Sequence, residues 1–150
     1  MDETRRQLSS REVVPASDTA SFIGRGLVWP MGVDHTGAIA LTRTADDIDR
    51  SIRVVLATAP GERVMRPDFG CAIWDQLFEP ITDNLFGLMR AAVLESVSRW
   101  EPRVTISDVV VSADPDDVTR VQIRVSYIVK ATNDARNLVY PFYVIPREED

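Results

Sequence analysis

The chain has 150 residues, a formal net charge of −6, one histidine and one cysteine. This length is that of a single domain, and the acidic charge argues against a general nucleic-acid-binding protein, which needs a basic face for its phosphate contacts. One histidine and one cysteine exclude a multi-histidine metal site and an intrachain disulfide, so we expect no cofactor.

Residues 1–21 are polar, contain Pro15 and offer little to bury, which predicts a flexible N-terminal arm ahead of one domain over residues 22–150. The arm leads into no apolar stretch of the kind that secretory signals carry. No run approaches the roughly 18 apolar residues of a membrane span. We therefore expect assembly in the cytoplasm, with no direct membrane insertion.

Two short extended segments are predicted over residues 22–30 and 38–41, with a turn between them. A helix then begins at Thr44, which is a good N-cap with Asp47 three residues later, and it ends at Pro60-Gly61. The buried face of this helix is predicted from its apolar spacing: Ile48, Ile52, Val55 and Leu56.

A loop over residues 61–70 and a short helix over 71–78 lead to the longest predicted helix, 82–100. Its apolar residues follow the three-four spacing of one buried stripe: Leu85, Leu88, Met89, Ala92, Val93, Val97 and Trp100. Pro102 follows and ends the helix.

The C-terminal third changes to a period of two. Residues 104–111 are rich in β-branched side chains, 121–130 alternate between apolar and polar, and 138–145 form a third strand interrupted by Pro141. Because proline cannot donate to a ladder, this strand is predicted at an edge. The sequence therefore predicts an α+β domain with two to three helices packed on a C-terminal three-stranded antiparallel sheet.

Carboxylates offer the only enzymatic alternative that the residue types support. A glycosidase needs two of them about 5–10 Å apart across a cleft. By chemistry alone the candidates are Asp68, Asp75, Glu79 and Glu101, and their spacing selects no pair. We therefore predict no catalytic residue.

Two clusters combine arginine, carboxylate and proline. One is Glu101-Pro102-Arg103, and the other spans 61–70 and includes Gly61, Glu62, Arg63, Arg66, Pro67, Asp68, Phe69 and Gly70. They are consistent with local salt bridges and caps, each worth under about 1 kcal/mol if exposed. They are equally consistent with arginine forks held rigidly for bidentate docking to a partner. The residues alone do not separate these two interpretations.

These clusters, together with the segment before the first helix, resemble the baseplate wedge family of contractile tails, which is often labelled lysozyme-like. The resemblance covers about residues 22–145 and rests on several motifs in order: Phe22 to Gly26, Trp29-Pro30, Asp34, Gly37 to Leu41, Pro60 to Arg63, Arg66 to Cys71, and Glu101 to Arg103. The family includes proteins of phage baseplates, type VI secretion systems and extracellular contractile injection systems.

The resemblance implies a non-enzymatic adaptor, present in six copies and similar in fold to the docking domain of the sheath protein. It would join the baseplate wedge to the first sheath ring and help to start sheath assembly. The implied partners are the sheath protein, other wedge subunits and proteins near the tube or hub.

Docking within the baseplate is implied for Glu101, Pro102 and Arg103, and we expect the loop over 63–69 to pack on the helices and stiffen that corner. Strand exchange with the sheath is expected at the C-terminal strand, through Leu138, Tyr140, Phe142 and Val144. A tail-associated cell-wall glycoside hydrolase of lysozyme type and an adaptor unrelated to tails remain the alternatives. The sequence does not tell a phage from a secretion system or a released injection device.

Overall fold

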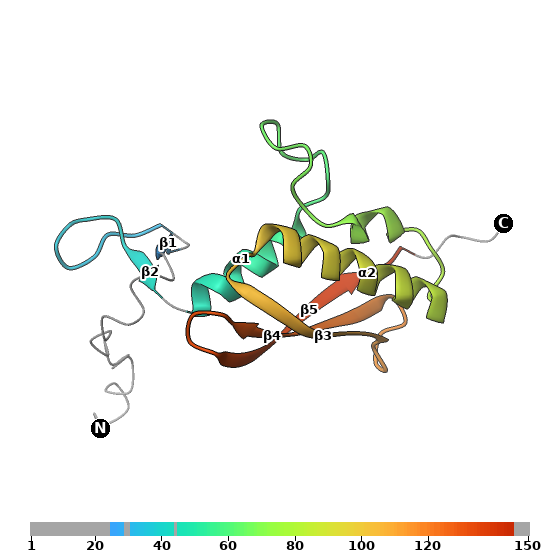
Figure 1. Cartoon of the computed structure of the whole chain (residues 1–150). Coiled ribbons are helices and arrows are strands. Elements are labelled where there is room, and N and C mark those ends of the chain that lie inside the picture. Colours follow the sequence, from blue (N-terminus) through green and yellow to red (C-terminus); the bar gives the residue numbers. More distant parts are fainter. Residues whose placement is uncertain (1–24, 29–30, 44, 146–150) are drawn as a thin grey trace, which may run out of the picture.

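A computed structural model describes residues 25–28, 31–43 and 45–145, so the predicted arm and the predicted N-cap Thr44 lie outside the described residues. Its elements, in chain order, are β1 (Arg25–Leu27), β2 (Leu41–Arg43), α1 (Ala45–Ala57), the 3-10 helix η2 (Ala72–Gln76), α2 (Asp83–Trp100), β3 (Val104–Ala113), β4 (Arg120–Val129) and β5 (Asp134–Tyr143) (Figure 1). Strands β3, β4 and β5 form an antiparallel sheet in that order, and β1 pairs with β2 in a separate ribbon.

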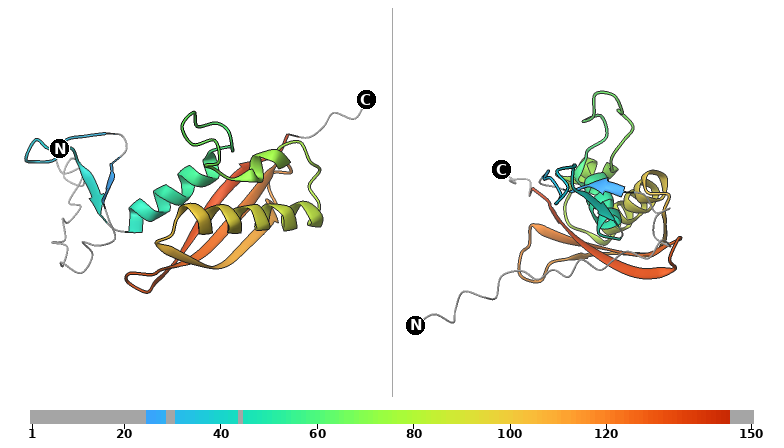
Figure 2. Two further views of the ribbon diagram at one scale, coloured as in Figure 1. Left: turned by 45° about the horizontal axis from the view of Figure 1, so that its top comes forward. Right: turned by 90° about the vertical axis from the view of Figure 1, so that its left-hand side faces the viewer.

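The domain has two layers, because both long helices lie on one face of the three-stranded sheet (Figure 2). Alternate residues of β4 face the helices and are almost completely buried: Val121, Ile123, Val125, Tyr127 and Val129. The predicted face of α1 meets them and is equally buried, with Ile48, Ile52, Val55 and Leu56. The predicted α+β architecture is confirmed.

Helix α2 begins where the sequence predicts, since the Thr82 hydroxyl accepts a hydrogen bond from the Leu85 amide at 3.3 Å. Most of the residues predicted to form the buried face of α2 are buried, but this face is narrower than predicted. Leu88 is 49% exposed because it lies to one side of the line that faces the sheet, so its predicted burial is wrong. The Ser96 side chain is buried instead, and its hydroxyl donates to the Ala92 carbonyl.

Strand β5 begins at Asp134, four residues earlier than the predicted start at 138. Its first residues, Asp134 to Asn137, lack apolar alternation, and pairing with β4 fixes them as strand. Pro141 pairs with Gln122 on β4, and β5 is an edge of the sheet, as its proline predicted.

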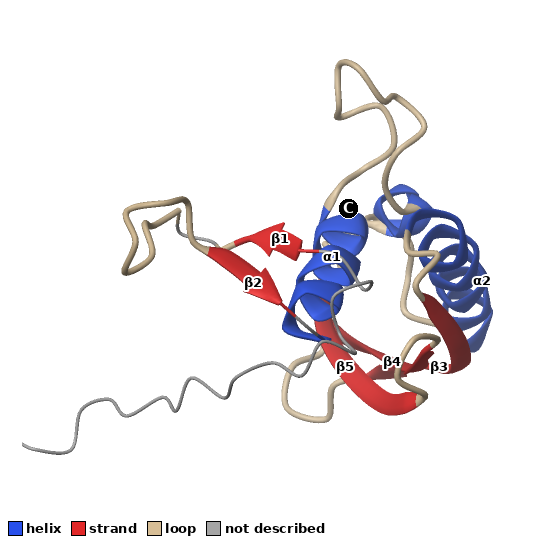
Figure 3. Cartoon of the chain, turned by 60° about the vertical axis from the view of Figure 1, so that its left-hand side comes forward, coloured by secondary structure: helices blue, strands red, loops and turns tan. Residues whose placement is uncertain are grey.

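The β1–β2 ribbon extends away from the helices and the sheet (Figure 3). Its turn is closed by the Asp34 carboxylate, whose Oδ1 accepts from the Thr36 amide at 2.8 Å and from the Ala38 amide at 3.1 Å. The predicted strand over 38–41 is shifted, because β2 occupies Leu41–Arg43 and Ile39 makes only a single bridge to Val33.

Candidate functional site

Glu101 and Arg103 form a buried joint directly after α2. The Glu101 side chain is only 2% exposed, and the Arg103 guanidinium grips both of its oxygens: Nε donates to Oε1 and Nη2 donates to Oε2, each at 2.6 Å. Arg103 Nη1 also donates to Asp47 Oδ2 at 2.9 Å. Since Asp47 lies in the first turn of α1, this one arginine connects the end of α2 to the start of α1.

The electrostatics of the joint keep both of its groups charged. Burial raises the pKa of Glu101, but hydrogen bonds from Arg103 and Ser51 outweigh burial and hold that pKa below its usual range. The hydrogen bonds to Glu101 raise the pKa of Arg103. A glycosidase acid needs the opposite shift, because it must stay protonated near neutral pH. Glu101 is therefore unsuited to be that acid.

The turn at Pro102 is tied to the sheet by the residue after β4. Lys130 Nζ donates to the Pro102 carbonyl at 2.8 Å, and the Lys130 amide donates to the Arg103 carbonyl at 3.0 Å. Pro102 itself is exposed, and the Arg103 side chain is 30% exposed. Glu101 and Arg103 could bind a partner protein or each other across the local turn. In this structure they bind each other.

The loop over residues 61–70 is closed at its base. The Gly61 amide donates to the Pro67 carbonyl at 2.7 Å, and Glu62 Oε2 accepts from the Ala59 amide at 3.0 Å. Gly70 has a φ of +125°, and a Cβ there would lie 2.3 Å from the Thr58 carbonyl oxygen. Only glycine fits this close approach to the end of α1.

One side of the loop is held against the C-terminal end of α2. The Arg63 guanidinium lies 4.0 Å from the centre of the Phe69 ring, and that ring packs 5.1 Å from Trp100. Asp68 pairs with Arg99 at 2.8 Å. Asp68 and Phe69 therefore contact α2, while the far end of the loop projects away from the body (Figure 1).

The side chains named for strand exchange point into this chain's own core. Leu138, Phe142 and Val144 are each less than 5% exposed, and Tyr140 is half-buried. The apolar alternation marks the face that the helices cover, and a part for these four side chains in strand exchange stays a prediction. What β5 leaves open is its backbone edge and its outer face, where Val139 is 42% and Tyr143 is 53% exposed.

Hydrogen bonding at the end of β5 shows which backbone groups face outward. The Val144 amide donates to the Thr119 carbonyl at 2.8 Å, so the backbone N–H and C=O groups of even-numbered residues point towards β4. The backbone groups of odd-numbered residues point away from β4, so the missing N–H of Pro141 removes no hydrogen bond from the β4–β5 ladder. The outward amide of Ile145 is already bound to the Leu77 carbonyl at 2.8 Å. The amides of Val139 and Tyr143 therefore point to the open edge.

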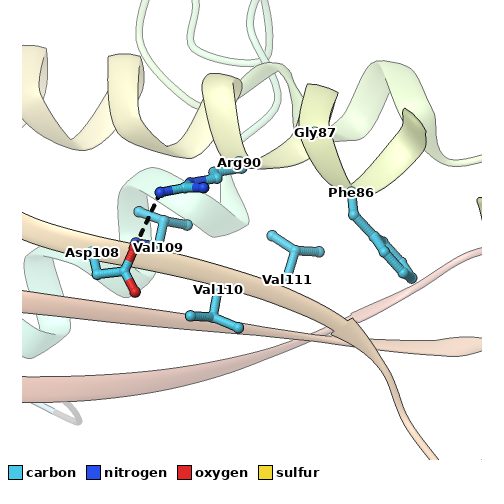
Figure 4. Close-up of a pocket in the computed structure, with 7 residues that line it drawn as sticks. All are labelled: Phe86, Gly87, Arg90, Asp108, Val109, Val110 and Val111. Atoms are coloured by element: carbon cyan, nitrogen blue, oxygen red, sulfur yellow. Dashed lines mark hydrogen bonds and ion pairs between the residues drawn. The ribbon is translucent and has the colours of Figure 1, made fainter. Parts of the chain in front are cut away.

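The opposite edge, β3, borders an open groove of about 300 Å³ beneath α2. Figure 4 shows Arg90 reaching from the helix to Asp108 on the strand, with 3.2 Å between Nη2 and Oδ1. The ladder has a bulge between Ile106 and Asp108, and the Asp108 carboxylate also accepts from the Val109 amide. This edge is thus partly blocked by its own side chains.

The described residues offer little to a metal ion or a membrane. Within residues 25–28, 31–43 and 45–145, no three histidine, cysteine or acidic side chains group together as metal ligands. No helix in the same ranges combines the length and the apolar character of a membrane span. Cys71 is buried, and burial raises the pKa of its thiol, so it stays protonated at neutral pH.

A two-layer α+β scaffold with an open strand edge belongs to the class of folds that can accept a strand from a partner protein. The profile of the baseplate wedge protein gp25 family matches residues 42–134, which is more than half of the chain, and the chain belongs to this family.

Three similar proteins can be set beside this assignment, two of them from baseplates and one named after a tail enzyme. Baseplate protein W of Escherichia phage P2 is 34% identical over 79 residues, which cover 53% of this chain and 68% of that protein. A crystal structure from Geobacter sulfurreducens, named a tail lysozyme, is 44% identical with a TM-score of 0.65 and covers 71% of this chain and 97% of its own. A chain of the anti-feeding prophage baseplate is 25% identical with a TM-score of 0.60, covering 87% and 93%. The protein is a structural baseplate component of a contractile tail system.

Proposed function

We propose that this baseplate component joins the wedge to the first sheath ring and helps to start sheath assembly, in six copies around the tube of a particle that assembles in the cytoplasm. The observation that carries the proposal is the open edge of β5, where the amides of Val139 and Tyr143 face outward. The sheath as the partner, tube- or hub-proximal neighbours and the number of copies come from the family resemblance.

Strand addition suits this edge because it uses backbone groups, which make few demands on the partner's sequence. By the same register the amides of Ala135 and Asn137 also face outward, whereas Pro141 offers no N–H and the amide of Ile145 is already bonded, so the acceptor edge is interrupted and ends at Tyr143. A proline in the edge limits unwanted pairing before assembly. The exposed Val139 and Tyr143 side chains would lie beside the incoming strand.

The Glu101–Arg103 joint supports docking within the wedge in an indirect way. Glu101 is too buried to meet a partner, and its charge is neutralised by Arg103. The exposed parts are Pro102 and the outer side of Arg103. We propose that these two residues contact another wedge subunit, while Glu101 holds them in place.

The decisive experiment removes one outward amide from β5. Val139→Pro deletes an N–H that faces away from β4, so the β4–β5 ladder keeps all its bonds. Val139→Ala is the matched control, because it shortens the side chain and keeps the amide. We expect the proline variant to fold and to give baseplates that lack sheath in electron micrographs, whereas the alanine variant assembles normally. Sheathed particles of normal number from the proline variant would refute strand addition at this edge.

The similar protein named a tail lysozyme makes cell-wall hydrolysis the second candidate. Against it stand the ion pair of Glu101 and the lowered pKa of that carboxyl. A peptidoglycan zymogram of the purified chain tests it, with Glu79→Gln and Glu101→Gln alongside. We expect no clearing from the wild type. Clearing that either variant abolishes would establish the enzyme and overturn a purely structural role.

A further inference from the structure

The projecting end of the loop over 61–70 displays two apolar side chains to solvent. We call residues 63–66 the tip segment. Within it Val64 is 94% exposed and Met65 is 89% exposed, which makes them the most exposed large hydrophobic side chains of the described residues. Single exposed apolar residues are ordinary on a protein surface, whereas here two consecutive large apolar side chains are almost fully exposed.

The tip segment is held in position from below. The loop is closed by the Gly61–Pro67 hydrogen bond, and Gly70 fits tightly against the end of α1. Within the tip, the Arg66 amide donates to the Arg63 carbonyl at 3.2 Å, and Arg63 rests on the Phe69 ring. A loop ordered before binding loses less entropy when it binds, so this geometry favours tight insertion.

The charged residues of the loop indicate what kind of surface the tip segment would bind. Glu62 is bound to the Ala59 amide and Asp68 to Arg99, so both carboxylates are satisfied inside the chain. Arg66 is exposed, and its side chain has no hydrogen-bond or ion-pair partner in the part of the chain that the structure describes. The tip therefore offers two apolar side chains beside a cation, although the whole chain carries a charge of −6.

We propose that the tip segment inserts Val64 and Met65 into an apolar socket on another baseplate subunit, with a carboxylate at the socket's rim that pairs with Arg66. Methionine and arginine are enriched in the buried centres of protein interfaces. Lipid is the poorer occupant, because stable membrane binding needs a larger apolar area or several cationic residues. The inference requires a baseplate location and does not depend on sheath joining.

A photo-activated cross-linker placed at position 65 in assembled particles tests the proposal, with mass spectrometry of the linked peptides. We expect cross-links to a different baseplate protein, at apolar residues within a few positions of an aspartate or glutamate. Position 118 is the matched control, because Val118 is 86% exposed in the turn between β3 and β4. Links only within this chain, to another copy of it, to sheath protein or to lipid would each overturn the assignment, as would a yield no higher than at position 118.

A second measurement keeps the test independent of the cross-linker. The double change Val64→Ser with Met65→Ser should leave the melting temperature unchanged and lower the yield of complete baseplates at least tenfold. Val118→Ser should affect neither. Unchanged baseplate yield from the double variant refutes the tip as a docking element. Loss of sheath alone, with baseplates intact, would also count against it and would point to the proposed sheath contact.

Discussion

Replacing Arg103 by alanine removes the partner of a buried charge. The variant loses the two 2.6 Å hydrogen bonds to Glu101 and the 2.9 Å bond to Asp47, while Glu101 remains 2% exposed. Breaking a buried ion pair from one side costs about 3–5 kcal/mol. Because the Arg103 side chain is 30% exposed, solvent screens part of its interaction, and we expect a loss near the lower end, about 3 kcal/mol.

The pH dependence of the loss follows from the pKa of Glu101. In the wild type this pKa lies below its unfolded value, so the pair contributes stability at neutral pH that disappears as the pH falls through the folded pKa. Without the Arg103 side chain, only the hydrogen bonds from Ser51 and from the amide of residue 103 still oppose burial, so the pKa of Glu101 rises and protonation relieves the variant as the pH falls. The difference in unfolding free energy between the two proteins should therefore be largest near pH 7 and shrink towards pH 4.

Urea denaturation of both proteins at the two pH values measures this difference. Arg99→Ala is the control, because Arg99 forms an exposed pair with Asp68, and its loss should cost under about 1 kcal/mol. A loss below about 1 kcal/mol for Arg103→Ala, or one that is equal at both pH values, would refute the buried-charge argument. In particles, we expect fewer assembled baseplates from Arg103→Ala, and normal numbers of full-length sheathed particles would remove its docking role.

Five further substitutions, two of them controls, test the packing and the electrostatics by denaturation. Gly70→Ala should destabilise the fold by at least about 2 kcal/mol, since its Cβ meets a backbone carbonyl, whereas Gly87→Ala in open space on α2 should stabilise it by about 0.5–1 kcal/mol; equal effects would contradict this. Met89→Ala, at a fully buried site, should lower the unfolding free energy by about 2–5 kcal/mol, and Leu88→Ala should lower it by under about 1 kcal/mol. The reverse order would show that Leu88, and not Met89, belongs to the buried face of α2. Hydrogen bonds from an arginine and an amide hold the pKa of Asp114 well below its usual range, so Asp114→Asn should reduce stability at pH 7 and flatten its decline below pH 4; an unchanged slope would count against it.

Period and turn residues predicted most of the fold. The apolar spacing located both helices, and the alternation over 121–130 located the central strand. Leu88 was misplaced because a three-four spacing admits residues at both edges of a stripe, and the actual width depends on what the helix packs against. The start of β5 was missed because pairing with β4, a tertiary effect, fixes residues that carry no strand pattern of their own.

The candidate site was predictable only as a set of residue types. Arginine beside carboxylate and proline pointed to Glu101 and Arg103, but no sequence pattern shows that Asp47, over fifty positions earlier, completes their ion pair. The outward amides of β5 depend on the ladder register, and sequence alternation instead drew attention to the inward side chains. The exposure of Val64 and Met65 depends on how the loop leaves the body, which Gly70 and Phe69 determine through contacts with α1 and α2.

The burial of Glu101 separates a structural role from a catalytic one. A catalytic acid gains its raised pKa when a carboxyl is buried without a cation, and it then remains available to substrate. Glu101 is buried with both oxygens bound to Arg103, so its charge is retained and its oxygens are occupied. A buried ion pair adds little stability compared with apolar side chains packed in its place. It does favour one arrangement of the two helices, because any other arrangement would leave a buried charge without its partner. A fixed arrangement of α1 and α2 suits a subunit that must dock in one orientation, and it requires no proton transfer by Glu101.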